Sequence, residues 1–167
     1  MIFTTGNVFD HVDKPLTYSF ITTNLGWKLN GENVMGAGVA KEAATRFPKL
    51  PKWYGTICQQ IANGAAHHWI TFAPHDVAPV AGWLGCFPTK ILDRQKPHLS
   101  WQRDSTLHCI ERSCIELKAH HLDIIAGKPV YLPLPGCGNG GLDPKDVRPL
   151  LLKYFRKVPN LTVLERK

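Results

Sequence analysis

The sequence predicts an α/β protein in which strands and helices alternate around one layered sheet. Two observations support this fold class. Short apolar runs alternate with segments whose apolar residues recur at helical spacing. Glycine clusters follow some of these runs and precede helix starts, which is where α/β folds place their ligand loops. The chain has 167 residues, enough for a sizeable core, and we expect residues 1–167 to form a single domain.

The first part of the chain is expected to form two strands and then two helices. The opening MIFTTGNVFD is strand-like, and residues 18–24 (YSFITTN) are rich in β-formers. Residues 39–47 carry apolar side chains at helical spacing, and Pro48 ends that segment. A second helix is expected over residues 52–61, with Asn63 and Gly64 as its stop.

The rest of the chain continues the alternation. Apolar runs predict strands at residues 68–72, 83–87, 130–134 and 161–164. A helix is expected from about residue 104 to 121, with an apolar stripe formed by Leu107, Ile110, Cys114 and Leu117. The last helix begins at a cap formed by Asp143, with Pro144 in its first turn.

Composition and charge limit the classes of partner. The net charge of +7 attracts polyanions such as nucleotides, nucleic acid or an acidic surface. The basic residues are scattered, so a solvated surface and a polyanion groove both remain open. No apolar run approaches the roughly 20 residues of a membrane span, and no signal peptide is evident. The five cysteines are odd in number and lack metal-ligand spacing, which indicates reduced thiols and a cytoplasmic protein.

Two glycine-rich segments predict a phosphate site. They are GENVMGAGVAKEA, residues 31–43, and PVYLPLPGCGNGGLDPKDV, residues 129–147. Glycine lets backbone N–H groups turn toward a ligand, and a helix N-terminus adds partial positive charge. Two such loops in one small domain favour a ligand with more than one phosphate, held without a metal ion.

The second loop also satisfies a dinucleotide-binding fingerprint. Gly136, Gly138 and Gly141 match GxGxxG after a strand and before a helix. That fingerprint belongs in the first βαβ unit of a dehydrogenase, with an acidic residue about 20 positions later that binds ribose. Here the nearest candidate is Glu165, two residues from the end of the chain. The sequence therefore argues against a dehydrogenase, but the prediction that this loop binds phosphate still stands.

Three segments occur in a distinctive order: GENVMGAGVAKEAATRFP, then FPTK, then PLPGCGNGGLDPKDVRPLL. In this order they resemble the macrodomain family of ADP-ribose-binding modules, over residues 6–151. The branch that they resemble most holds terminal ADP-ribose glycohydrolases and antitoxin macrodomains paired with toxins that ADP-ribosylate DNA. Similar domains are common in phage genomes, so a phage is a candidate source. The resemblance implies a three-layer α/β/α fold with a central mixed sheet.

The resemblance also implies which residues contact ADP-ribose. The adenine end lies near a Gly-Asp pair that corresponds here to Gly6 and Asn7, with Val8 next to it. Asn7 can accept a hydrogen bond from the adenine amine or only make a turn. Asn24 corresponds to an asparagine near the distal ribose, and residues 25–33 look like an insertion. The other expected contacts are two loops and Thr89: Met35, Gly36, Ala37, Gly38, Val39, Thr89, Pro135, Gly136, Cys137, Gly138, Asn139, Gly140, Gly141 and Leu142.

Lys90 is the candidate catalytic residue. In the branch that the chain resembles, the lysine after the FPT segment lies beside the anomeric carbon of the distal ribose. Such a lysine can lose its proton and attack that carbon, or remain cationic and stabilise negative charge. Lys90 can also be a simple phosphate contact. Related glycohydrolases pair the lysine with an aspartate where this chain has Gly140, which leaves the mechanism open.

Three other features have structural explanations. Trp101, Asp104 and Ser105 resemble the W-x-x-D-S segment of the branch, and Asp104 or Ser105 is expected to cap the following helix. Cys137 lies among glycines with no obvious base nearby, so a packing role is expected. Adjacent histidines at 67–68 and 120–121 diverge on a strand or helix and are poorly placed to chelate a metal.

The expected function is therefore that of a monomeric hydrolase that removes ADP-ribose from modified DNA or protein. A phosphatase acting on ADP-ribose 1″-phosphate and a non-catalytic ADP-ribose reader would use the same pocket. A general nucleic-acid-binding module would explain the charge but not the glycine loops.

Overall fold

The computed structural model describes residues 1–92, 105–121 and 126–166. Its strands are β1 (Ile2–Thr5), β2 (Tyr18–Leu25), β3 (Thr71–Phe72), β4 (Trp83–Ile91), β5 (Val130–Pro133) and β6 (Leu161–Glu165). Its helices are α1 (Gly38–Arg46), α2 (Leu50–Ala62), α3 (Leu107–Glu116) and α4 (Pro144–Phe155). Short helical turns occur at η1 (Val8–Asp10), η3 (Leu117–His121) and η4 (Gly138–Gly140). Trp101 and Asp104 lie outside the described residues, as do residues 93–100 between β4 and the segment that they belong to.

The strands form one mixed sheet in the order β1-β6-β5-β2-β4-β3. Four neighbouring pairs are parallel: β1 with β6, β6 with β5, β5 with β2, and β2 with β4. The fifth pair, β4 with β3, is antiparallel. Because parallel strands end at the same edge of a sheet, the loops that follow β2, β4 and β5 meet at one edge. The predicted central mixed sheet is confirmed.

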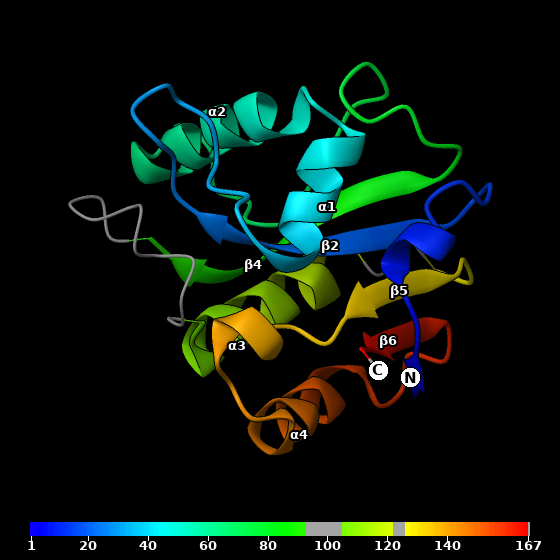
Figure 1. Cartoon of the computed structure of the whole chain (residues 1–167). Coiled ribbons are helices and arrows are strands. Elements are labelled where there is room, and N and C mark those ends of the chain that lie inside the picture. Colours follow the sequence, from blue (N-terminus) through cyan, green and yellow to red (C-terminus); the bar gives the residue numbers. More distant parts are fainter. Residues whose placement is uncertain (93–104, 122–125, 167) are drawn as a thin grey trace.

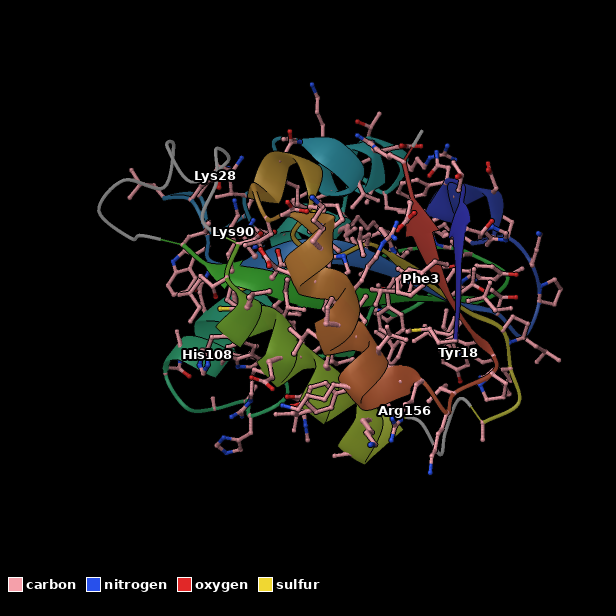
Figure 2. The ribbon with its side chains drawn as sticks, turned by 90° about the horizontal axis from the view of Figure 1, so that it is seen from below. Phe3, Tyr18, Lys28, Lys90, His108 and Arg156 are labelled. Carbon is pink, nitrogen blue, oxygen red and sulfur yellow. The ribbon has the colours of Figure 1, made fainter. Side chains whose placement is uncertain are left out.

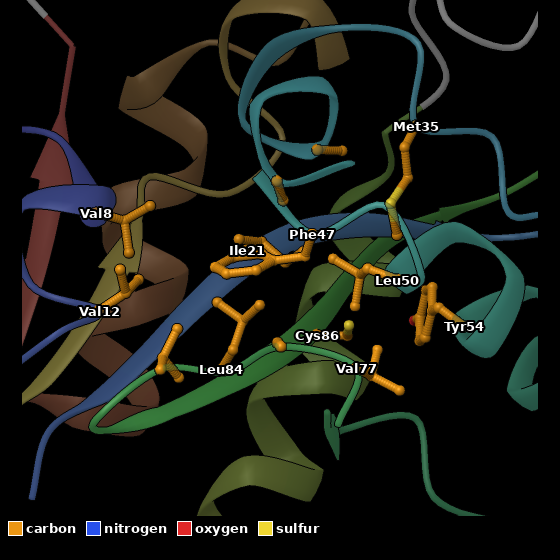
Figure 3. Close-up of a cluster of buried hydrophobic side chains, with 14 of the residues drawn as sticks. Val8, Val12, Ile21, Met35, Phe47, Leu50, Tyr54, Val77, Leu84 and Cys86 are labelled. Carbon is orange, nitrogen blue, oxygen red and sulfur yellow. The ribbon is translucent and has the colours of Figure 1, made fainter. Parts of the chain in front are cut away.

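Two cores separate the sheet from its helices. Figure 1 shows α1 and α2 over one face, and α3 and α4 over the other. Neighbouring residues of β2 pack into opposite cores, since the side chains of a strand alternate between the two faces of the sheet. Ile21 packs in the cluster with Leu50 and Tyr54 of α2 (Figure 3), whereas Phe20 packs with residues of α3 and α4. The predicted three-layer α/β/α arrangement is confirmed.

Several predicted bounds were wrong for local reasons. The strand predicted at residues 68–72 shortens to β3, because the N–H of Ile70 donates to the buried carboxylate of Glu116 over 2.8 Å. The helix predicted from residue 52 begins at Leu50, since Pro51 fits a first turn. The cap of α3 is Thr106, not Asp104 or Ser105: its hydroxyl accepts from the N–H of Cys109 over 3.1 Å. Leu107, predicted for the apolar stripe, is 40% exposed.

β4 extends past the predicted end of its strand through a proline. Pro88 has no N–H to donate, and the pairing with β2 shifts register there, from Thr23 opposite Pro88 to Asn24 opposite Lys90. Thr89 is the extra residue of this β-bulge. A bulge bends the strand and redirects the side chains beside it, so the bulge sets the direction of Thr89 and Lys90.

Residues 25–33 form a compact loop clamped to α2. The N–H of Asn33 donates to the carbonyl of Pro51 over 2.8 Å, and the Lys52 ammonium donates to the carbonyl of Asn30 over 2.7 Å. Gly55 permits this close packing. A Cβ built there would overlap the carbonyl oxygen of Gly31 and lie 2.8 Å from the nitrogen of Asn33.

Replacement of Gly55 by alanine is expected to lower the free energy of unfolding by about 1–3 kcal/mol, the usual cost of overpacking. The better helix propensity of alanine offsets at most about 1 kcal/mol of this cost. Urea unfolding followed by circular dichroism measures the change. Thr56→Ala, at an exposed position of the same helix, is the control. An unchanged midpoint for Gly55→Ala would contradict the close contact.

None of the helices within residues 1–92, 105–121 and 126–166 combines the length and apolar character needed to cross a bilayer.

Candidate functional site

A cavity of about 440 Å³ opens at the carboxyl edge of the sheet. Its walls come from the ends of β2, β4, β5 and β6, the two glycine loops and the first turns of α1 and α4. The predicted site residues that line it are Asn24, Gly36, Ala37, Gly38, Val39, Thr89, Lys90, Gly136, Cys137, Gly138, Asn139 and Gly140. Tertiary structure therefore brings together segments that are more than 100 residues apart in the chain.

The first glycine loop leads directly into α1. Gly38 adopts φ +59°, and the preceding residue, Ala37, has no polar side chain to cap the helix. The first N–H groups of α1 therefore remain available at the end of the helix that carries partial positive charge. No neighbouring atom lies within 4 Å of a Cβ built on Gly36, so the backbone there is open to a ligand.

The second glycine loop faces the first. Gly136, Gly138 and Gly141 have φ of +74°, +72° and +77°, a region that L-residues rarely adopt. The loops approach each other closely, because a Cβ on Gly38 would lie 3.2 Å from the side-chain nitrogen of Asn139. The cleft between two such backbone turns is suited to an anion with several oxygens.

Lys90 and Asn24 lie opposite each other on adjacent strands at one end of the cavity. Lys90 is only 8% exposed, and Figure 2 shows it near the end of β4. The amide of Asn24 is fixed on both sides: its nitrogen donates to the carbonyl of Val34 over 2.7 Å, and its oxygen accepts from Asn33 over 2.9 Å. Asn33 thus ties the loop over residues 25–33 to the cavity.

Two buried hydroxyl groups lie between Lys90 and the second loop. The Ser105 hydroxyl is 3.1 Å from that of Thr89, which in turn is 3.3 Å from the carbonyl of Thr23. Ser105 also fills the space beside Gly140. A Cβ on Gly140 would overlap the Ser105 hydroxyl oxygen and lie 2.9 Å from its Cβ. Position 140 therefore has no room for a side chain while Ser105 is in place.

Comparison with solved structures identifies the fold. The macrodomain of Thermus aquaticus DarG superposes with a TM-score of 0.70 at 21% identity, over 99% of this chain and 97% of that one. The macrodomain of Mycobacterium tuberculosis DarG gives 0.70 at 23% identity, over 99% and 95%. Thermosipho africanus DarTG in complex with ADP-ribose gives 0.67 at 19% identity, over 99% of this chain and 41% of that one.

The chain has the macrodomain fold. No protein-family model matches the sequence, and no curated protein matches it. The fold predicted from the three ordered segments is thus confirmed by structure at low sequence identity.

Several predicted site residues lie outside the lining of the cavity. Val8 and Met35 are buried, and Figure 3 shows both side chains in the core between the sheet and the helices α1 and α2. Asn7 caps the turn η1, and its side-chain oxygen accepts from the N–H of Phe9 over 3.2 Å. Pro135, Gly141 and Leu142 belong to the second loop without being part of the described lining.

The sequence prediction missed a charged pair at the other end of the cavity. Arg148 of α4 contacts Glu165, the last residue of β6, at 2.6 Å, and both line the cavity with Arg166. Other lining residues that were not predicted are Thr22, Thr23, Val34, Ala40, Pro133, Leu134, Pro144 and Leu164. The position of Glu165 could have been predicted, because it ends the last strand of the chain. In a parallel sheet, the carboxyl end of that strand lies at the same edge as the glycine loops.

Cys137 lines the cavity but has the properties of a packed thiol. Burial raises its pKa to about 11, and the nearby charges of Asp143 and Glu165 act in the same direction. Within the described part of the chain, no group of three His, Cys, Asp or Glu side chains could hold a metal ion.

Cys137 is expected to react slowly with iodoacetamide, because at pH 8 a pKa of 11 leaves about 0.1% thiolate, against about 24% for an ordinary cysteine. The rate should rise steadily as the pH approaches 11. Peptide mapping by mass spectrometry at several pH values measures it, and urea-unfolded protein is the control. Rapid modification at pH 7 would contradict the raised pKa.

Proposed function

We propose that this macrodomain binds ADP-ribose and hydrolyses the bond between its distal ribose and a modified macromolecule. The observation that carries the proposal is the position of Lys90, a buried lysine in the same cavity as two facing glycine loops. The complex of Thermosipho africanus DarTG with ADP-ribose, a protein of the same fold, supports the choice of ligand.

The order of the strands matches the order of groups in ADP-ribose. From one side of the cavity to the other, the strand ends are β6, β5, β2 and β4. The glycine loops follow β5 and β2, so a diphosphate would lie in the middle. Adjacent strands are about 4.8 Å apart, which places β6 and β4 about 14 Å apart. Adenosine would then lie toward β6, and the distal ribose toward Lys90 on β4.

Lys90 can contribute to hydrolysis in two ways. As a neutral amine, it attacks the anomeric carbon while the bond to the macromolecule breaks, its electron pair leaves with the macromolecule, and water later hydrolyses the adduct. As a cation, it stabilises the negative charge that develops on the leaving atom while water attacks directly. Gly140 supplies no carboxylate to assist either step.

We propose modified DNA as the substrate, with modified protein as the alternative. The net charge of +7 favours a polyanionic macromolecule. The decisive experiment incubates the wild-type protein with ADP-ribosylated DNA, ADP-ribosylated protein and ADP-ribose 1″-phosphate, and follows the products chromatographically. Calorimetric titration with ADP-ribose is run alongside.

Each result of this experiment favours one function. Release of ADP-ribose from DNA or protein supports the hydrolase, and release of phosphate alone supports the phosphatase. Binding of ADP-ribose without turnover of any substrate indicates a reader. Failure to bind ADP-ribose, together with salt-sensitive binding of unmodified DNA, would replace the proposal with a nucleic-acid-binding module.

A further inference from the structure

The charged pair between Arg148 and Glu165 lies at the end of the cavity away from Lys90. We infer that Glu165, oriented by Arg148, recognises the base of the bound nucleotide by accepting a hydrogen bond from the exocyclic amine of adenine. The inference rests on the proposed binding of ADP-ribose and goes further by assigning a base-selective residue.

Arg148 orients the carboxylate of Glu165 through one of its two oxygens. Arg148 contacts the same oxygen, Oε1, twice: Nη2 at 2.6 Å and Nε at 2.9 Å. Among the described residues, none donates a hydrogen bond to the other oxygen, Oε2. A carboxylate oxygen can only accept hydrogen bonds, so Oε2 offers an acceptor to a ligand in the cavity.

Arg148 is itself held in place. Its guanidinium carbon lies 5.4 Å from the centre of the Phe3 ring, a cation–π distance, and Phe3 belongs to β1, next to β6 in the sheet. Figure 2 shows Phe3 on the side of the molecule away from Lys90. Arg148 is thus a positioning residue that aims the Glu165 carboxylate.

Asn7 is poorly available for the same task. Its side-chain oxygen already accepts from the N–H of Phe9, and Asn7 lies outside the described cavity lining. Glu165 lies close to it, because the carbonyl of Glu165 accepts from the N–H of Gly6 over 3.1 Å. An acceptor is therefore present at this end of the cavity, on β6 instead of the loop after β1.

An acceptor discriminates between two purines that differ at one position. Adenine carries an amine at position 6, which donates, whereas hypoxanthine carries a carbonyl there, which accepts. Facing Oε2, the carbonyl would leave two acceptors opposed and one of them without a partner. We therefore expect the wild-type protein to bind ADP-ribose at least about tenfold more tightly than inosine diphosphate ribose.

The variant Glu165→Gln should reverse this preference. Its amide oxygen would keep the contact with Arg148, since a guanidinium only donates, and its NH₂ group would then face the ligand. That group donates to the hypoxanthine carbonyl and opposes the adenine amine. Calorimetric titration of both nucleotides into both proteins measures the reversal. Glu42→Gln is the matched control, because Glu42 pairs with Arg46 through the same two nitrogens outside this cavity.

The outcomes separate the inference from the proposed function. If the wild-type protein binds neither nucleotide, the proposed function fails. If it binds both equally, or if Glu165→Gln keeps the wild-type preference, the base-reading role of Glu165 is overturned while ADP-ribose binding stands. An equal loss of affinity for both nucleotides in Glu165→Gln would also overturn it, since contact with the ribose hydroxyls or loss of charge would have that effect.

Discussion

Replacement of Lys90 by alanine is expected to lower the turnover of ADP-ribosylated substrate by at least about 100-fold, the usual scale for loss of a nucleophile or charge-stabilising group. The affinity for free ADP-ribose should change far less, because both glycine loops remain. Single-turnover release assays and calorimetric titration measure the two effects separately. Lys157→Ala, at an exposed position near the end of the chain, controls for the loss of one positive charge.

A second variant, Lys90→Arg, separates the two roles of the lysine. Arginine stays protonated, so it cannot act as a nucleophile, but it can still stabilise negative charge. Partial activity in Lys90→Arg would support the electrostatic role. A covalent adduct on Lys90, trapped by rapid denaturation and seen by mass spectrometry, would support the nucleophilic one. Equal release by wild type and Lys90→Ala would remove Lys90 from the mechanism.

Replacement of Gly140 by alanine is expected to weaken ADP-ribose binding by about tenfold or more, because the new methyl group would overlap Ser105. Either the second loop or the backbone at Ser105, just before α3, must move, at a cost of about 1–3 kcal/mol. A double variant tests this cause directly. Ser105→Gly removes both atoms that the methyl group would meet, so it should restore binding to Gly140→Ala.

Gly138→Ala provides the matched comparison for this cycle. A Cβ on Gly138 meets no atom within 4 Å, but its φ of +72° would strain alanine. Ser105→Gly should therefore give no rescue of Gly138→Ala. The coupling between positions 105 and 140 is obtained from the four affinities of the cycle. Additive effects would show that the overlap with Ser105 is not the cause of the loss in Gly140→Ala.

The elements that were predicted well have causes that are local in the chain. α4 begins where it was expected, with Asp143 accepting from the N–H of Lys145 over 2.8 Å. β2 needs only its run of β-formers. By contrast, β3 is shortened by Glu116, the last residue of α3, and β4 continues through Pro88 because a bulge accommodates it. Neither influence can be recognised from neighbouring residues.

The candidate site also combines features that the sequence predicts with contacts that only the tertiary structure shows. The glycine loops can be recognised in the sequence because positive φ angles and open backbone require glycine itself. Lys90 was predicted from the resemblance of its FPTK segment to the macrodomain family. The contact of Ser105 with Gly140 joins residues 35 positions apart. The pair of Arg148 and Glu165 depends on the placement of α4 against β6, which hydrophobic packing determines.

The sequence by itself thus determined the fold class, the two glycine loops and the lysine that we propose acts on the distal ribose. Only the tertiary structure decided that Ser105 closes the space beside Gly140 and that Glu165 offers an acceptor at the opposite end. The physical reason is that backbone conformation is encoded by each residue and its neighbours. The space and the partners around a side chain are set by segments distant in the chain, once the layers have packed.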